Sequence, residues 1–149
     1  MSVDEPHTRP EITAALARGV ARLLWNHGLA PLLEVPLANG RRADLMGLAP
    51  GGEIWIVETK SCVEDFTVDQ KWPDYRDYCD RFFFAVTAEF PHELIPGDVG
   101  LMVADQFGGA IVREAPLASL AGARRKAVTL LFARLAAQRL AGATPPPAP

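Results

Sequence analysis

The sequence lacks the features of an exported protein, of a small cysteine- and histidine-ligated metal protein, and of a membrane protein. Its only two cysteines, Cys62 and Cys79, form no C-x-x-C pair, and its three histidines show no metal-ligand spacing. No apolar run approaches the roughly 20 residues that span a bilayer. The first residues, MSVDEPHTRPE, are acidic and polar, unlike a secretory signal. We therefore expect reduced thiols in a cytoplasmic protein that makes no contact with a membrane.

An excess of positive charge is also missing. The formal net charge of −3 argues against a protein that coats nucleic acid by bulk electrostatics. It leaves room for a local basic patch, and arginine, the commoner basic residue here, suits phosphate contacts. With 49% apolar and 22% charged residues, the 149-residue chain has an ordinary globular composition. We expect one domain over residues 9–141, a mobile arm over 1–8 and a disordered proline-rich tail over 142–149.

Local signals predict the order of helices and strands. Thr8 and Glu11 form a capping box before an apolar pattern of helical spacing that Gly28 ends. Asn39-Gly40 is a strong hairpin signal, and the continuous apolar run Ile54–Val57 is typical of a central strand. We expect helices over 9–27, 70–80 and 117–140, and strands over 32–37, 42–48, 53–58, 82–86, 101–104 and 110–113. This order predicts an α/β fold, a mixed β-sheet flanked by α-helices.

Three charged residues stand where burial alone would place apolar ones. Glu58 and Lys60 are two apart near the end of a predicted strand, so they emerge on the same face. The hairpin partner strand can bring Asp44 beside them. Two converging carboxylates bind a hard cation such as Mg²⁺ (or Mn²⁺), and the backbone carbonyl of Thr59 is a candidate further ligand. Lys60 could orient water or stabilise developing charge.

These residues resemble the PD-(D/E)xK nuclease pattern of the superfamily that includes type II restriction enzymes. Asp44 and the run Val57-Glu58-Thr59-Lys60 carry the likeness, whereas Ala43 departs from it where the pattern has proline. The resemblance implies a restriction-endonuclease-like mixed sheet flanked by helices, with Asp44, Glu58 and Lys60 as its catalytic core. Without Asp44, a solvent-facing pair would be the simpler interpretation of Glu58 and Lys60, since E-x-K is a common tripeptide.

A second resemblance, to the MmcB-type bacterial DNA repair proteins, extends over nearly the whole chain. It implies a nuclease-like fold and a role in the DNA damage response, and no particular reaction. The stretches that carry it are Gly40 to Asp44, Val57 to Ser61, Asp65-Phe66, Asp69 to Tyr75, Cys79 to Phe82 and Arg124 to Lys126.

The superfamily often adds a glutamate and a later glutamine to the site. Gln70 is the candidate for the glutamine. Glu34 is favoured over Glu11 for the glutamate and would be a metal ligand, although an edge-strand residue facing water is an equal alternative. Candidates for nucleic-acid contacts are Arg42, Lys71, Tyr75, Arg124, Arg125 and Lys126. A charge run on a helix is usually a solvated face. Aromatic residues more often anchor a helix than stack on bases, so we favour a core position for Trp72 and leave both interpretations open for Tyr75.

The first functional hypothesis is a Mg²⁺-dependent DNA endonuclease acting in repair. The alternative is a catalytically weak or inactive nuclease-fold module that binds DNA or a partner in a repair complex. A nuclease acting on RNA is a third option, because no residue distinguishes the two nucleic acids. Besides DNA and other repair proteins, a second copy of the chain is a candidate partner, since the superfamily includes homodimers.

Overall fold

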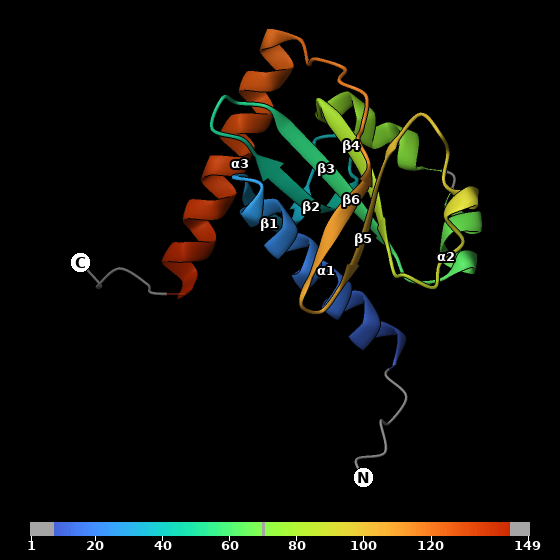
Figure 1. Cartoon of the computed structure of the whole chain (residues 1–149). Coiled ribbons are helices and arrows are strands. Elements are labelled where there is room, and N and C mark those ends of the chain that lie inside the picture. Colours follow the sequence, from blue (N-terminus) through green and yellow to red (C-terminus); the bar gives the residue numbers. More distant parts are fainter. Residues whose placement is uncertain (1–7, 70, 144–149) are drawn as a thin grey trace.

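The chain folds around a sheet in which every strand lies next to its neighbours in sequence (Figure 1). The structure is a computed structural model, and it describes residues 8–69 and 71–143. In that part of the chain the elements are α1 (Arg9–Asn26), β1 (Ala30–Pro36), β2 (Arg42–Leu48), β3 (Ile54–Lys60), α2 (Val63–Val68), the 3₁₀ helix η1 (Trp72–Tyr78), β4 (Arg81–Val86), the 3₁₀ helix η2 (His92–Leu94), β5 (Gly100–Asp105), β6 (Gly108–Arg113) and α3 (Gly122–Ala143).

The sheet combines both kinds of pairing. β1, β2 and β3 form an antiparallel meander, β3, β4 and β5 run parallel, and β5 and β6 pair as an antiparallel hairpin. From Phe82 to Val86, strand β4 is buried at every position, as a central strand covered on both faces should be. The prediction of a mixed sheet flanked by helices is confirmed.

Helix α1 covers one face of the sheet (Figure 1). It begins with the predicted capping box, in which Thr8 accepts a hydrogen bond from the Glu11 N–H and Glu11 accepts one from the Thr8 N–H. Leu16, Val20 and Leu24 of the helix are buried against the strands. At Gly19 the helix approaches the β5–β6 turn so closely that a Cβ would collide with the carbonyl of Asp105.

The opposite face is covered by α2, η1 and α3. Its core contains Phe82 and Phe84 of β4, with Val128 and Phe132 of α3.

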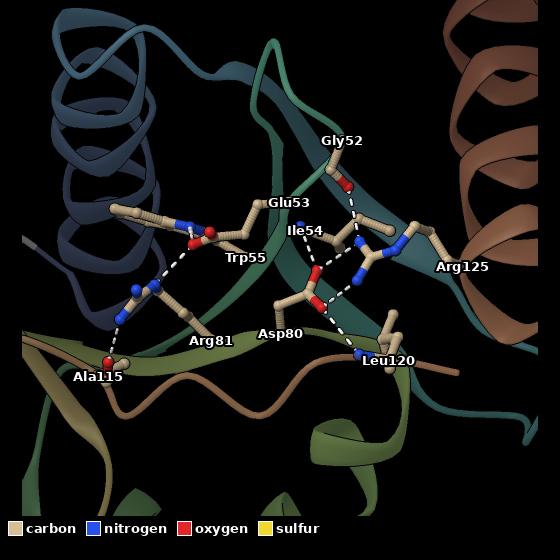
Figure 2. A network of polar contacts seen from close by, with 9 residues as sticks. All are labelled: Gly52, Glu53, Ile54, Trp55, Asp80, Arg81, Ala115, Leu120 and Arg125. Atoms are coloured by element: carbon tan, nitrogen blue, oxygen red, sulfur yellow. Dashed lines mark hydrogen bonds and ion pairs between the residues drawn. The ribbon is translucent and has the colours of Figure 1, made fainter. Parts of the chain in front are cut away.

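The buried carboxylate of Asp80 links β3, α3 and the segment that precedes α3 (Figure 2). It accepts hydrogen bonds from the Ile54 and Leu120 N–H groups and from two nitrogens of Arg125, at 2.5 and 2.8 Å. Burial opposes ionisation, yet these donors hold the pKa of Asp80 below its usual value.

Two predicted helices differ from the observed ones. Within the range 70–80 the structure has the 3₁₀ helix η1 (Trp72–Tyr78) rather than an α-helix, and the short helix α2 before it was not predicted. The Asp69 side chain accepts the N–H groups of Lys71 and Trp72, and this local bonding competes with a continuous α-helix. The last helix begins at Gly122 rather than 117, because the segment before it donates backbone N–H groups to Asp80 instead of forming a first turn.

Candidate active site

The carboxyl groups of Asp44 and Glu58 meet where the β2–β3 ladder ends. The last paired residues are Leu45 and Val57, and the same register would place Asp44 opposite Glu58. Beyond that point, backbone N–H groups donate to side-chain carboxylates instead of to backbone carbonyls of the neighbouring strand. The Asp44 N–H donates to Oε1 of Glu58 at 2.8 Å, and the Thr59 N–H donates to Oδ2 of Asp44 at 2.8 Å. The Thr59 hydroxyl adds a third bond, to the same Asp44 oxygen. Each carboxyl group is thus held by hydrogen-bond donors of the neighbouring strand.

Burial and the neighbouring acid perturb the ionisation of Glu58. The residue is only 5% exposed. Desolvation, followed by the charge of Asp44, raises the pKa of Glu58 to about 9, and the nearby charge of Lys60 only partly opposes that rise. Strongly perturbed carboxyl groups are concentrated at functional sites. Two neighbouring acids of which one is buried favour a bound cation, which would neutralise both groups.

Lys60 reaches a third acidic residue. Its Nζ lies 2.7 Å from Oδ2 of Asp69, and the two side chains are 12% and 15% exposed. Burial disfavours the charged form of Asp69, but the hydrogen bonds from Lys60 and from the Lys71 N–H bring its pKa below the usual value. Sequence reasoning missed Asp69 as a site residue. The only sequence signal for Asp69 is its position directly before Gln70, in the stretch Asp69 to Tyr75 that resembles the MmcB-type proteins.

The donor set for a metal consists of the carboxylate oxygens of Asp44 and Glu58. Hard oxygen ligands of this kind suit Mg²⁺ or Mn²⁺, so the residues present fit the predicted ion. Among residues 8–69 and 71–143, no three histidine, cysteine or acidic side chains gather closely enough to hold a metal together. Water and a substrate phosphate could then supply further oxygen ligands. The Thr59 carbonyl stays a predicted additional ligand.

Glu34 lies near this pair without joining it. In the β1–β2 register Glu34 would face Asp44, but the ladder skips this position and Glu34 has a φ of 50°. Arg139 of α3 donates to the carbonyls of Leu33 and Glu34, which holds this irregular backbone in place. The Glu34 carboxylate is exposed and faces Arg42 at 3.9 Å. The structure thus gives Glu34 a position at the rim of the site.

The remaining candidates are scattered. Gln70 lies outside the described residues. Tyr75 is buried, stacks on Phe82 and donates its hydroxyl to the Arg42 carbonyl. At 8% exposure the Tyr75 side chain presents little surface to a base, so an anchoring role fits its surroundings, and the nucleic-acid contact stays a prediction. Burial, then the charges of the nearby Glu58 and Asp44, raises the pKa of Tyr75.

The three basic residues at the start of α3 have different surroundings. Arg125 is engaged by Asp80, so it is a structural residue and not a free phosphate ligand. The guanidinium of Arg124 lies 4.5 Å from the centre of the Tyr78 ring, a cation–π contact at the surface. Lys126 is exposed, as are Lys71 and Arg42. The structure does not bring Arg124 or Lys126 together with Asp44 and Glu58 in one cavity.

A groove opens beside Asp44. It lies between α1 and the strands β1–β3, has a volume of about 650 Å³, and is bordered on the strand side by Glu34, Asp44 and Thr59. The groove therefore reaches Asp44 from the α1 side of the sheet, whereas Glu58 and Lys60 do not border it. In the part of the chain that the structure describes, no helix has both the length and the apolar character needed to cross a membrane.

Comparison with known proteins supplies a family. The sequence model of the DNA repair protein MmcB-like family matches residues 3–146. A protein of unknown function from Silicibacter pomeroyi has a solved structure with 47% sequence identity and a TM-score of 0.86, covering 97% of this chain and 95% of that one. A repair endonuclease from Pyrococcus abyssi is 18% identical over 60% of this chain and 42% of that one, with a TM-score of 0.36, a likeness too low to bear on fold or activity. No curated protein matches the chain.

Proposed function

The chain belongs to the MmcB-like DNA repair protein family, and we propose that it is a metal-dependent nuclease that hydrolyses phosphodiester bonds in DNA. The observation that carries this proposal is the pairing of the half-buried Asp44 with the buried Glu58, which are connected by hydrogen bonds at the end of the β2–β3 ladder. Folding two acids against each other costs stability unless a cation accompanies them. A site of this kind is more readily explained by chemistry than by packing.

Each polar side chain has a role in this proposal. Asp44 and Glu58 would hold Mg²⁺ or Mn²⁺ through their carboxylates. When bound, such an ion supplies Lewis acidity toward a phosphate oxygen and lowers the pKa of a coordinated water. Asp69 fixes the ammonium group of Lys60 within electrostatic reach of Glu58. From that position Lys60 can stabilise negative charge that develops on the phosphate.

The test combines metal binding with cleavage. Mn²⁺ would be titrated calorimetrically into the wild type, Asp44→Asn, Glu58→Gln and Glu114→Gln, the last being an exposed acid outside the site. We expect the first two substitutions to abolish specific binding and the control to retain it. The same proteins would then be incubated with Mg²⁺ and single-stranded, branched and damaged DNA. Cleavage that depends on Asp44 and Glu58 is the expected result.

A second candidate function is a DNA-binding or protein-docking module without catalysis. The observation that favours it is the engagement of Lys60 by Asp69, since a lysine held by an acid is less free to act on a substrate. Specific Mn²⁺ binding without cleavage of any tested DNA would support this module. The absence of Mn²⁺ binding, both alone and with DNA present, would contradict the nuclease proposal.

A further inference from the structure

We propose that the groove between α1 and strands β1–β3 is the track for a single DNA strand, and that Arg9 and Arg18 bind its phosphates. This inference deepens the proposed function and rests on it, because the groove leads to Asp44. Neither arginine was singled out by the sequence, where both are merely polar positions of an amphipathic helix. Only the packing of α1 across the sheet brings them to the groove that Asp44 borders.

The two walls of the groove carry opposite charge. Arg9 and Arg18 border it on the helix side, whereas Glu34 and Asp44 border it on the strand side. The one acidic residue in the first turn of α1, Glu11, does not border this groove. It borders a second cavity, between α1 and the β5–β6 hairpin, which Arg18 also borders. A phosphodiester chain entering the groove therefore meets guanidinium groups on one side. On the other side it meets Glu34 and Asp44, and Asp44 is one of the two carboxylates proposed to hold the metal.

Both arginines can be recruited by a ligand. Within the described residues, no ion pair or hydrogen bond engages the exposed guanidinium of Arg18. Arg9 lies 3.6 Å from Asp65 in an ion pair whose side chains are 63% and 38% exposed. Exposed pairs of this kind contribute little and exchange readily for a better partner. A phosphate, which arginine can bind with two parallel hydrogen bonds, is such a partner.

The dimensions of the groove indicate one strand rather than a duplex. Its volume of about 650 Å³ is that of a small-ligand pocket, too small to enclose a double helix. Between the arginines, the helix wall presents the small residues Thr13, Ala14 and Ala17, which leave space for sugar and base. With a rise of about 1.5 Å per residue, Arg9 and Arg18 are about 14 Å apart along α1. That distance is about four nucleotides of one strand at 3.4 Å each.

The test measures binding independently of cleavage. A fluorescein-labelled oligothymidine with phosphorothioate linkages, which resist hydrolysis, would be titrated by anisotropy in Mg²⁺ at several salt concentrations. The proteins are the wild type, Arg9→Gln, Arg18→Gln and the double variant. Arg22→Gln is the matched control, because Arg22 is exposed on the same helix and does not border the groove. Thermal unfolding would verify that each variant is folded.

Each lost phosphate contact should lower the salt slope, log Kd against log salt, by about 0.7 for a single strand. We expect a reduction of about 0.7 for each single variant, about 1.4 for the double variant and none for Arg22→Gln. An unchanged slope in the double variant, or no binding by the wild type, would overturn the inference. A duplex of equal length that binds as tightly, with the same dependence on both arginines, would refute the single-strand assignment.

Cleavage of unmodified DNA, measured in parallel, separates this inference from the nuclease proposal. If binding depends on Arg9 and Arg18 but the wild type cleaves no DNA, the strand-binding inference stands and the nuclease proposal is refuted. Cleavage that depends on Asp44, in a protein whose strand binding ignores both arginines, would do the reverse.

Discussion

The ammonium group of Lys60 lies 2.7 Å from the carboxylate of Asp69, and both side chains are largely shielded from solvent. The same carboxylate accepts the N–H groups of Lys71 and Trp72 at the start of η1. Asp69 therefore joins the end of β3 to the next segment of the chain and sets where the Lys60 charge resides. It is a positioning residue for the proposed site.

Asp69→Asn should disturb Lys60 more than it disturbs the metal site. Without its partner carboxylate, the largely buried ammonium of Lys60 is left poorly compensated, which we expect to cost about 1–3 kcal/mol of stability in urea denaturation. DNA cleavage should fall by about tenfold or more, while Mn²⁺ affinity changes little. Asp74→Asn is the control, because it removes a more exposed pair with Arg41 and should cost less than about 1 kcal/mol. Equal effects of the two substitutions would contradict this role.

The raised pKa of Glu58 predicts an unusual dependence of stability on pH. The pKa of Glu58 is about 9 in the folded protein and near 4.5 when exposed, so between these values the folded state binds the extra proton. The contribution of Glu58 to stability is present below about pH 4.5 and is lost as pH rises toward 9. In this window the free energy of unfolding should fall by up to about 1.4 kcal/mol per pH unit because of Glu58.

Glu58→Gln should remove this contribution, since its amide oxygen can still accept the Asp44 N–H without titrating. Urea denaturation at pH 5 and pH 8, without metal, measures the change. We expect the variant to exceed the wild type in stability at pH 8 by more than at pH 5. Mn²⁺ should stabilise the wild type more at the higher pH and should leave the variant unaffected. A pH dependence identical in both proteins would show that Glu58 ionises normally.

Asp80→Ala should be among the most destabilising single substitutions in the chain. It removes the acceptor for two backbone N–H groups and leaves Arg125 without its carboxylate (Figure 2). Breaking a fully buried ion pair typically costs about 3–5 kcal/mol, and because the Arg125 side chain is 32% exposed we expect a loss of about 2–4 kcal/mol. Denaturation of Asp98→Ala gives the comparison, because Asp98 pairs with Arg76 at the surface. A loss for Asp80→Ala no larger than for Asp98→Ala would refute the structural role of Asp80.

Tyr75→Phe separates anchoring from nucleic-acid binding. The phenolic hydroxyl donates to the Arg42 carbonyl, and its loss should cost about 1 kcal/mol of stability, the usual contribution of such a bond. Because the ring is buried on Phe82, affinity for the labelled oligothymidine should stay unchanged. Weakened DNA binding by a fully folded Tyr75→Phe protein would instead show that Tyr75 contributes to nucleic-acid binding.

Sequence alone determined the features that neighbouring residues specify. Thr8 and Glu11 predict the start of α1 because a cap acts within one turn of helix. Asp44 and Glu58 were placed together because two short strands joined by a tight turn must lie side by side, whichever way the rest of the chain folds. The alternation of side chains along β3 then put Glu58 and Lys60 on the same face.

Tertiary structure decided everything that depends on contacts between distant segments. The partner of Lys60, the capture of Arg125 by Asp80 and the exclusion of Tyr75 from the surface follow from how η1, β4 and α3 pack on the sheet. The position of Arg18 opposite Asp44 likewise exists only because α1 crosses the strands there. The local sequence determines the charge of a side chain and the face of the helix or strand on which it lies. Which residue it contacts depends on packing, which many residues determine together.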